Sequence, residues 1–249
     1  MATRGNKQSV WLEEYDITSF LVDFKKKLSL FGLLNLLQES AWRHADHLGH
    51  GYRQTRDAGT SWVLARQRIE VESWPDWGDK LVVRTWLRPP SAVVVTRDFQ
   101  LTVGPREIGQ ASAHWVTIDH RTRRLTPLPF AKDSSQFRQE GHLSINPRKV
   151  TITRPLKPVA QFQVQQSDLD MNGHVNNTRF SQWILDSLPT EAHQSHILKL
   201  YEINFLAEAC LGDLVEILGS TQADKLLFQG RRVGDGKLLF ATEVAGTRA

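Results

Sequence analysis

The chain has 249 residues, of which 40% are hydrophobic and 23% are charged; this balance is typical of a globular protein with one large domain or two small ones, at roughly 150 residues per domain. Its single cysteine excludes an internal disulfide framework and points to a reducing compartment, for which we expect the cytoplasm. Lys and Arg number 31 against 27 Asp and Glu, and the basic clusters are not interleaved with aromatic residues, so we expect no nucleic-acid partner.

Two features of the sequence argue against export and membrane insertion. Residues 1–7 are polar and lead into no apolar segment, so we expect no secretory signal. The most apolar stretch, residues 28–37, has about half the length that a membrane-spanning helix requires. We therefore expect no membrane span.

The first predicted element is a long helix over residues 29–47. One face of it carries leucines at the i, i+3, i+4 and i+7 spacing, namely Leu30, Leu33, Leu34 and Leu37. Three histidines stand at or just beyond its end, namely His44, His47 and His50. Their spacing could suit a metal ion, but polar and cationic side chains are also favourable in the last turn of a helix. We favour the second interpretation and expect neither a metal ion nor a cofactor.

Alternating apolar runs after this helix predict a series of antiparallel strands. The runs lie at residues 69–71, 81–84, 93–95, 99–103 and 113–118. The first two flank a Gly-Asp turn, and the same pattern recurs 134 positions later at residues 203–205 and 215–217. This constant offset indicates two copies of one structural unit.

A second, shorter helix is predicted just before the second copy. One face of it is marked by Phe180, Ile184 and Leu188. Asn176 or Asn177 is a suitable N-cap, and Pro189 ends the helix. Further alternating runs at residues 226–228 and 237–244 complete the strands of the second copy.

The region between the two copies predicts the domain organisation. Residues 133–149 are polar and turn-rich, and two prolines follow them. We therefore expect an N-terminal unit over residues 1–140, a linker over residues 141–158 and a C-terminal unit over residues 159–249. One helix packed on one face of an antiparallel sheet gives each unit an α+β architecture. Two such units can pair their sheet edges within one chain, so we expect a monomer or a homodimer.

The segment richest in polar side chains capable of catalysis is residues 167–180, a turn that leads directly into the second helix. Turns rich in Asp, Asn and Gly are common for structural reasons alone. Here, however, His174 stands between a glycine and the start of a helix. The backbone N–H groups at that start, those of Val175 and Asn176, could stabilise an oxyanion together with the helix dipole.

This segment closely resembles the active-site segment of the acyl-[acyl-carrier-protein] thioesterases. The resemblance rests on Asp168-Leu169-Asp170-Met171-Asn172-Gly173-His174-Val175-Asn176-Asn177 and on Trp183-Ile184-Leu185-Asp186-Ser187. It extends into the first half at Gln38-Glu39-Ser40-Ala41, Trp62-Val63-Leu64 and Trp115-Val116. The resemblance implies a tandem hotdog fold, in which each half wraps an antiparallel sheet around its long helix. It also implies that the N-terminal half binds the acyl chain and that the C-terminal half is catalytic.

The same resemblance implies the catalytic residues. Carried over position by position, the family's set falls on Asp170, Asn172, His174 and Glu208. The first copy has Asp23, Lys25, Lys27 and Trp74 at roughly matching positions. Only the second half therefore carries the whole set, which implies one active site per chain.

The sequence departs from some family members in the position of its cysteine. Ala209 occupies the position directly after the glutamate, and Cys210 follows one residue later. In a strand, a shift of one residue turns a side chain to the opposite face. We therefore expect Cys210 to be a small buried hydrophobe, which favours attack by water over a thiol nucleophile.

The chemistry of thioester hydrolysis fits this set. The thiolate leaves readily, so the reaction needs mainly a base that activates water and donors that stabilise the oxyanion. Asp170 and Glu208 are the two candidate bases. We favour Glu208, with Asp170 fixing Asn172 and His174, which orient the water or bind the carbonyl.

The expected function is the hydrolysis of fatty acyl-[acyl-carrier-protein] thioesters, which releases a free fatty acid and ends chain elongation. The basic groups at residues 25–27 or 121–124 could dock the acidic carrier. Three alternatives stay open: an acyl-CoA thioesterase of the same fold, a hotdog hydratase acting on a 2-enoyl or 3-hydroxyacyl thioester, and a non-catalytic acyl-thioester-binding protein. The complete catalytic set favours an enzyme.

Overall fold

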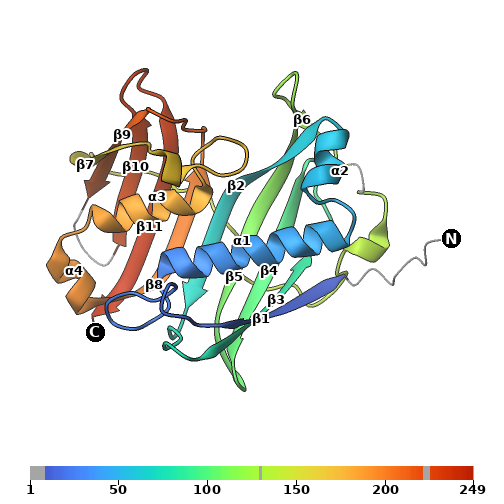
Figure 1. Cartoon of the computed structure of the whole chain (residues 1–249), viewed down its shortest axis with the longest axis horizontal. Helices are drawn as coiled ribbons and strands as arrows, with labels where there is room; N and C mark the ends of the chain where they lie inside the picture. Colours follow the sequence, from blue (N-terminus) through green and yellow to red (C-terminus); the bar gives the residue numbers. More distant parts are fainter. Residues whose placement is uncertain (1–8, 129–130, 221–224, 249) are drawn as a thin grey trace. The chain divides into compact units, whose positions relative to one another are not determined.

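The chain folds into two α+β units (Figure 1), described by a computed structural model over residues 9–128, 131–220 and 225–248. Unit 1 comprises Met1–Ala65 and Glu72–Asn146, and unit 2 comprises Arg66–Val71 and Pro147–Ala249. The division after Asn146 falls inside the predicted linker. The expectation of no secretory signal concerns residues that lie outside the described ranges. No helix in those ranges combines the length and the apolar character needed to cross a membrane.

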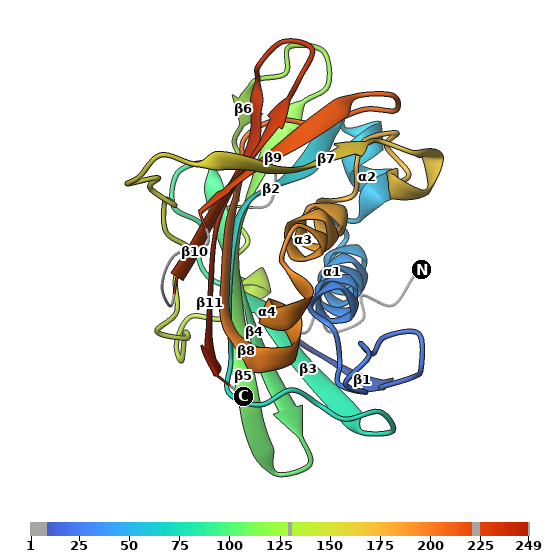
Figure 2. The same cartoon turned by 90° about the vertical axis from the view of Figure 1, so that its left-hand side faces the viewer.

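Unit 1 is an antiparallel sheet with one long helix on one face (Figures 1 and 2). Its strands are β1 (Val10–Asp16), β2 (Thr60–Val71), β3 (Lys80–Leu87), β4 (Val94–Val103), β5 (Arg106–Asp119) and β6 (Leu125–Thr126). Its helical segments are α1 (Leu30–His47), α2 (Tyr52–Asp57) and the 3₁₀ turn η1 (Ser134–Gln136). The strands are ordered β1-β3-β4-β5-β2, with β6 paired to β5. Only the first part of β2 belongs to unit 1, because its residues 66–71 group with unit 2.

Helix α1 confirms the prediction made from the leucine spacing. Ser29 is its N-cap, and the Ser29 side chain accepts a hydrogen bond from the Gly32 N–H at 3.0 Å. The face predicted to be apolar is buried, and Leu37 has no exposed surface. On the same helix Ser40 bonds to Tyr15 of β1 at 2.9 Å, so the helix is tied to the sheet by polar as well as apolar contacts.

Unit 2 repeats the pattern of an antiparallel sheet with a helix along one face. Its strands are the second part of β2, then β7 (Lys157–Gln163), β8 (His196–Phe205), β9 (Leu214–Ser220), β10 (Lys225–Arg232) and β11 (Leu238–Arg248). Its helical segments are the 3₁₀ turn η2 (Gln166–Asp168), α3 (Asn177–Asp186) and α4 (Thr190–Ser195). The strand order is β2-β8-β11-β10-β9-β7. Residues 66–70 of β2 pair with residues 200–204 of β8, which explains why this part of β2 belongs to unit 2.

Helix α3 packs on the sheet through aromatic rings. Phe180 lies 5.0 Å from Phe240 and 5.5 Å from Trp183, measured between ring centroids, and Trp183 stacks on Phe162 at 5.6 Å. The helix begins after the N-cap Asn176 and ends before Pro189, as predicted. Strand β7 begins inside the predicted linker, at a place where Pro158 disfavours a strand interior. A proline is tolerated there because β7 is an edge strand, and the pairing has a bulge after Pro158.

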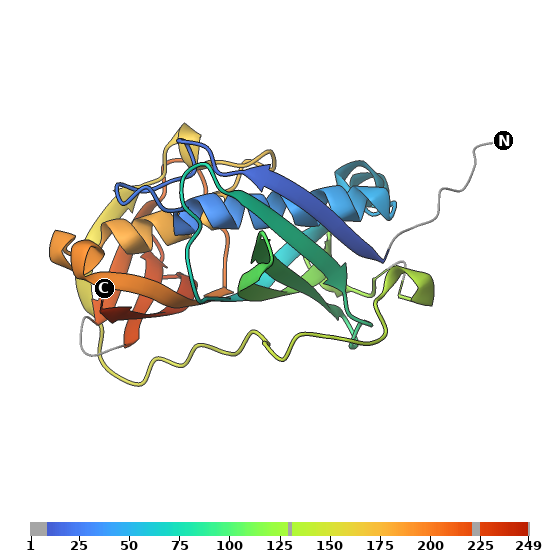
Figure 3. The ribbon, with the colours of Figure 1, turned by 90° about the horizontal axis from the view of Figure 1, so that it is seen from below.

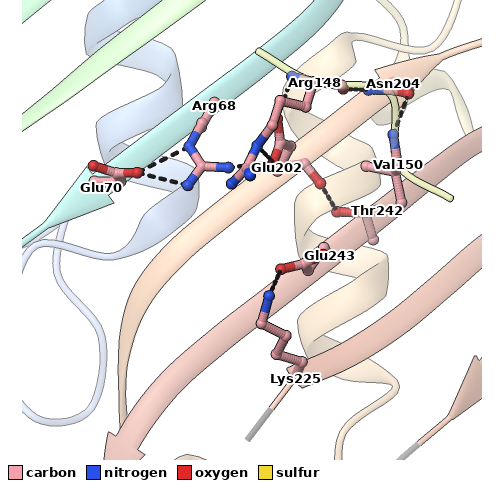
Figure 4. Close-up of polar contacts among 9 residues, drawn as sticks. All are labelled: Arg68, Glu70, Arg148, Val150, Glu202, Asn204, Lys225, Thr242 and Glu243. Atoms are coloured by element: carbon pink, nitrogen blue, oxygen red, sulfur yellow. Dashed lines mark hydrogen bonds and ion pairs between the residues drawn. The ribbon is translucent and has the colours of Figure 1, made fainter. Parts of the chain in front are cut away.

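The segment that leads into unit 2 runs along the face of the sheet opposite α3 (Figure 3). Val150 packs on Leu227 and Ala241 there. The side-chain amide of Asn204 on β8 accepts from the Val150 N–H at 2.8 Å, and the buried carboxylate of Glu202 accepts from the Arg148 N–H (Figure 4). The segment is therefore fastened to β8 by two buried polar side chains.

Candidate active site

The turn before α3 positions three of the predicted catalytic residues. The Asp170 N–H donates to the His174 carbonyl at 2.8 Å, and the Gly173 N–H donates to the Asp170 carbonyl at 3.1 Å. The Asp170 carboxylate accepts from the Asn172 backbone N–H at 2.8 Å and from Asn172 Nδ2 at 3.3 Å. The Asp170 side chain therefore contacts Asn172, whereas its bond to His174 is made by the backbone.

Gly173 allows this turn to close, because its φ is +76°. A Cβ added at Gly173 would meet no atom within 4 Å, so a substitution changes only the backbone preference. Gly173→Ala is expected to lower the free energy of unfolding by about 1 kcal/mol, the cost of a left-handed conformation. Urea denaturation measures this change. The control is Gly234→Ala, which also has open space around its Cβ but no positive φ; equal losses in the two variants would contradict the explanation.

His174 and Glu208 meet across two segments of the chain. His174 Nε2 lies 3.6 Å from Glu208 Oε2, and the two side chains are 33% and 42% exposed. The Val175 N–H donates to the Ala209 carbonyl at 2.9 Å, which joins the turn before α3 to the stretch that carries Glu208. The four predicted catalytic residues thus form two contacting pairs, Asp170 with Asn172 and His174 with Glu208, on two directly bonded segments of unit 2.

The predicted oxyanion donors are placed differently from the expectation. The Val175 N–H is bonded to the Ala209 carbonyl, and the Asn176 N–H donates to the Asp168 carbonyl at 2.8 Å. The Asn176 side chain caps α3 by accepting from the Thr178 N–H at 3.0 Å. Both N–H groups are engaged with carbonyl oxygens, which removes them as oxyanion donors in this structure.

Cys210 also differs from the expectation, since it is exposed rather than buried. Strand β8 ends at Phe205, and the residues after it belong to no named helix or strand before the turn at Gly212. In this stretch Ala209 is buried, while Glu208 and Cys210 on either side are exposed. Neighbouring side chains do point to opposite faces, as predicted, but Ala209 rather than Cys210 lies on the buried face.

Unit 1 contains the same turn, but of the four catalytic side chains it keeps only the aspartate, Asp23. The Asp23 N–H donates to the Lys27 carbonyl at 2.8 Å, and the Leu28 N–H donates to the Pro75 carbonyl at 2.9 Å. Lys27 Nζ forms an ion pair with Asp76 at 2.7 Å. The two backbone bonds match those that Asp170 and Val175 make around His174, so the approximate alignment of the two copies is confirmed. Unit 1 has Trp74 where unit 2 has Glu208, which supports a single site per chain.

Each of the three histidines near the end of α1 contacts other side chains. His44 Nδ1 is 2.9 Å from Arg97 Nη1, His50 Nε2 is 2.8 Å from Gln136 Oε1, and the His47 ring lies 5.0 Å from the Trp11 ring. The described residues contain no group of three or more His, Cys, Asp or Glu side chains placed to hold a metal ion.

The sequence did not identify the contacts that hold the stretch carrying Glu208 at its C-terminal end. Asp213 bonds to the Cys210 N–H at 2.9 Å, and Arg232 on β10 bonds to Asp213 at 3.0 Å. The repeated Gly-Asp pair was a signal for Asp213, because it recurs in both copies. Arg232 was visible only as part of a small basic cluster.

Each unit therefore has a helix lying along one face of an antiparallel sheet, which is the hotdog arrangement, and the predicted α+β fold with two hotdog units in one chain is confirmed. Two family models match the chain: the acyl-ACP thioesterase N-terminal domain over residues 8–131 and the acyl-ACP thioesterase C-terminal domain over residues 156–233. The chain belongs to the acyl-ACP thioesterase family.

Individual relatives agree with this assignment. Oleoyl-acyl carrier protein thioesterase 1 of Arabidopsis thaliana, a chloroplastic protein, is 30% identical over 237 residues, which cover 85% of this chain and 64% of the relative. A chloroplastic oleoyl-acyl carrier protein thioesterase of Coriandrum sativum is 28% identical over 257 residues, covering 93% of this chain and 68% of the relative. The chain thus spans about two thirds of the length of these relatives.

Two solved structures share the whole architecture. An acyl-ACP thioesterase from Bacteroides thetaiotaomicron has a TM-score of 0.88 at 26% identity and covers 96% of this chain, with 98% of that chain matched. The 12:0-ACP thioesterase from Umbellularia californica has a TM-score of 0.85 at 19% identity, with 100% of both chains matched, and shares the fold.

Proposed function

We propose that the chain hydrolyses fatty acyl-[acyl-carrier-protein] thioesters. Water adds to the thioester carbonyl carbon, the carbon–sulfur bond breaks, and a fatty acid and the free thiol of the carrier are released. The observation that carries the proposal is the approach of His174 to Glu208 at 3.6 Å, beside the Asp170–Asn172 turn, in a member of this family. This pairing offers a carboxylate and an imidazole, the two groups most often used for proton transfer at neutral pH.

Glu208 is the proposed base in this reaction. Its carboxylate takes a proton from the attacking water, and the thiolate that leaves takes up a proton afterwards. His174 orients the water or the carbonyl, and Asn172, fixed by Asp170, offers a side-chain amide donor. Because Asp170 already accepts two hydrogen bonds from Asn172, a positioning role suits it better than a role as base.

The acidic carrier is the proposed partner, with the basic groups at residues 25–27 and 121–124 as docking sites. Lys27 in the first group also forms an ion pair with Asp76, and we assign the group as a whole to the carrier. A monomer or a homodimer can carry the activity, since one chain contains the whole catalytic set. The exposed thiol of Cys210 is compatible with a reducing compartment, and we retain the cytoplasm as the proposed location.

Matched substrates with the same acyl chain test the proposed carrier. The kcat/KM for the acyl-carrier-protein thioester is expected to exceed that for the CoA thioester and to fall as the salt concentration rises, because electrostatic docking is screened. A small uncharged acyl thioester serves as the control and should show no salt dependence. Equal salt dependence for the small thioester, or a higher kcat/KM for CoA, would contradict the assignment and favour an acyl-CoA thioesterase.

Product analysis separates hydrolysis from the two remaining functions. Release of free fatty acid with stoichiometric free thiol supports the proposal. Dehydration or hydration of the acyl chain would instead identify a hydratase, and binding without turnover would identify an acyl-thioester-binding protein.

A further inference from the structure

The turn that follows Glu208 is closed by one carboxylate. Asp213 Oδ2 accepts from the Cys210 N–H at 2.9 Å, and the Asp213 N–H donates to the Cys210 carbonyl at 3.0 Å. Gly212 lies between them at a φ of +83°. The Asp213 side chain therefore fixes the backbone two residues beyond Glu208.

Arg232 fixes that carboxylate from a different strand. Arg232 Nη1 donates to Asp213 Oδ2 at 3.0 Å, while its Nε and Nη2 donate to the two oxygens of Asp235 at 3.0 Å each. All three guanidinium nitrogens are thus engaged, and the bonds to Asp235 and Asp213 raise the pKa of Arg232 above its usual range. A planar guanidinium with three fixed bonds has little freedom to move, so it is a rigid anchor for Asp213.

The anchored turn continues into the His174–Glu208 pair. Ala209, between Glu208 and Cys210, accepts the Val175 N–H at 2.9 Å. The stretch that carries Glu208 is therefore held at two points: at Ala209 by the segment of His174, and at Cys210 by Asp213 and Arg232. A shift of the second point moves Glu208 relative to His174.

Unit 1 shows that the turn itself does not require the arginine. There Asp79 Oδ2 accepts from the Asp76 N–H at 2.9 Å, and Gly78 has a φ of +89°, so the turn has the same geometry. Arg232 pairs across the sheet with Val215. In unit 1 the residue that corresponds to Val215 is Leu81, and its cross-strand partner is Val103. The cation is thus present in the copy that carries His174 and Glu208, and an uncharged side chain stands at its position in the other.

We propose that Arg232 is a positioning residue for thioester hydrolysis: through Asp213 it fixes the turn that sets Glu208 against His174. This role rests on the proposed function. Small displacements of a base from its reactive geometry are costly, because a misplacement of about 1 Å can lower a rate by about 10²-fold. Substrate contacts are left intact, so the effect falls on kcat.

Arg232→Gln tests the proposal with two measurements. We expect kcat to fall by about 10-fold or more while KM stays within about twofold. Amide hydrogen exchange in residues 206–213 should become faster, whereas residues 72–79 of unit 1 should exchange as in the wild type and serve as the internal standard. The variant is expected to fold, because Arg232 lies at the partly exposed end of a hairpin and its side chain is 21% exposed.

Two control variants separate this link from a general loss of charge. Arg231→Gln removes the neighbouring cation, which pairs with Glu216, and Asp235→Asn leaves the bond between Arg232 and Asp213 in place. Both are expected to keep kcat within about twofold of the wild type. A loss in Asp235→Asn as large as that in Arg232→Gln would overturn the role assigned to Asp213.

The outcomes also separate this inference from the proposed function. If the wild type hydrolyses acyl-carrier-protein thioesters and Arg232→Gln retains its kcat, the positioning role is wrong and the proposed function stands. If the wild type hydrolyses none of these thioesters, the proposed function is wrong and the positioning role falls with it.

Discussion

Glu208→Gln is expected to lower kcat for acyl-carrier-protein hydrolysis by about 10²–10⁴-fold, the usual contribution of a positioned general base. Glutamine keeps the size of the side chain but cannot accept the proton from water. Because Glu208 is exposed and its side chain is 42% accessible, the variant should fold like the wild type. Single-turnover measurements on one acyl-carrier-protein substrate, with circular dichroism as the folding control, test this expectation.

Three companion variants show which group acts in which role. His174→Ala should lose most activity as well, since the ring lies against Glu208. Asp170→Asn should lose less than Glu208→Gln, because its acceptor oxygen can still bond to Asn172. Cys210→Ser should retain activity if water is the nucleophile. Near wild-type turnover in Glu208→Gln would contradict its role as base, and an inactive Cys210→Ser would restore the thiol nucleophile.

Glu202→Ala is expected to lower the free energy of unfolding by about 3 kcal/mol, the lower end of the cost of breaking a buried ion pair. Glu202 is 3% exposed, and its carboxylate lies 2.5 Å from Arg68 Nη1 and accepts from the Arg148 N–H (Figure 4). The substitution leaves this N–H without its acceptor and removes one carboxylate from Arg68. Arg68 keeps Glu70 at 2.7 Å, which limits the loss.

The same region of unit 2 offers the control for this measurement. Lys225 pairs with Glu243 at 2.9 Å, but its side chain is 63% exposed (Figure 4). Lys225→Ala should therefore change the free energy of unfolding by less than about 1 kcal/mol. Urea unfolding followed by fluorescence and by circular dichroism gives both values. A loss in Glu202→Ala no larger than that in Lys225→Ala would show that the buried pair contributes little.

The elements that depend on local sequence could be predicted. Helix α1 followed from the spacing of its leucines, and α3 followed from Asn176 and Pro189, because periodicity and caps act within a few residues. The repeat predicted two units, since the same Gly-Asp turn recurs at a constant offset. The pairing of residues 66–70 of β2 with β8 could not be predicted, because strand partners are chosen by packing between segments far apart in the chain.

The candidate site could be predicted in its residues but not in its bonds. The motif identified His174 and, through the family resemblance, Glu208. The engagement of the Val175 N–H with Ala209, and the exposure of Cys210, depend on how two distant segments pair. Arg232 carried no signal of its own, because a cation at a strand end is usually a solvated side chain and its partner Asp213 comes from another part of the sheet.

The turn of unit 1 in which Lys27 pairs with Asp76 has a practical consequence for unit 2. Unit 1 keeps the backbone bonds of the turn although Lys25, Lys27 and Trp74 stand in place of Asn172, His174 and Glu208, and only Asp23 matches Asp170. The turn is therefore a scaffold that tolerates replacement of its reactive groups. Catalytically inactive forms of unit 2 can be made without sacrificing the fold, and such forms are suited to holding an uncleaved acyl thioester long enough for the complex to be studied.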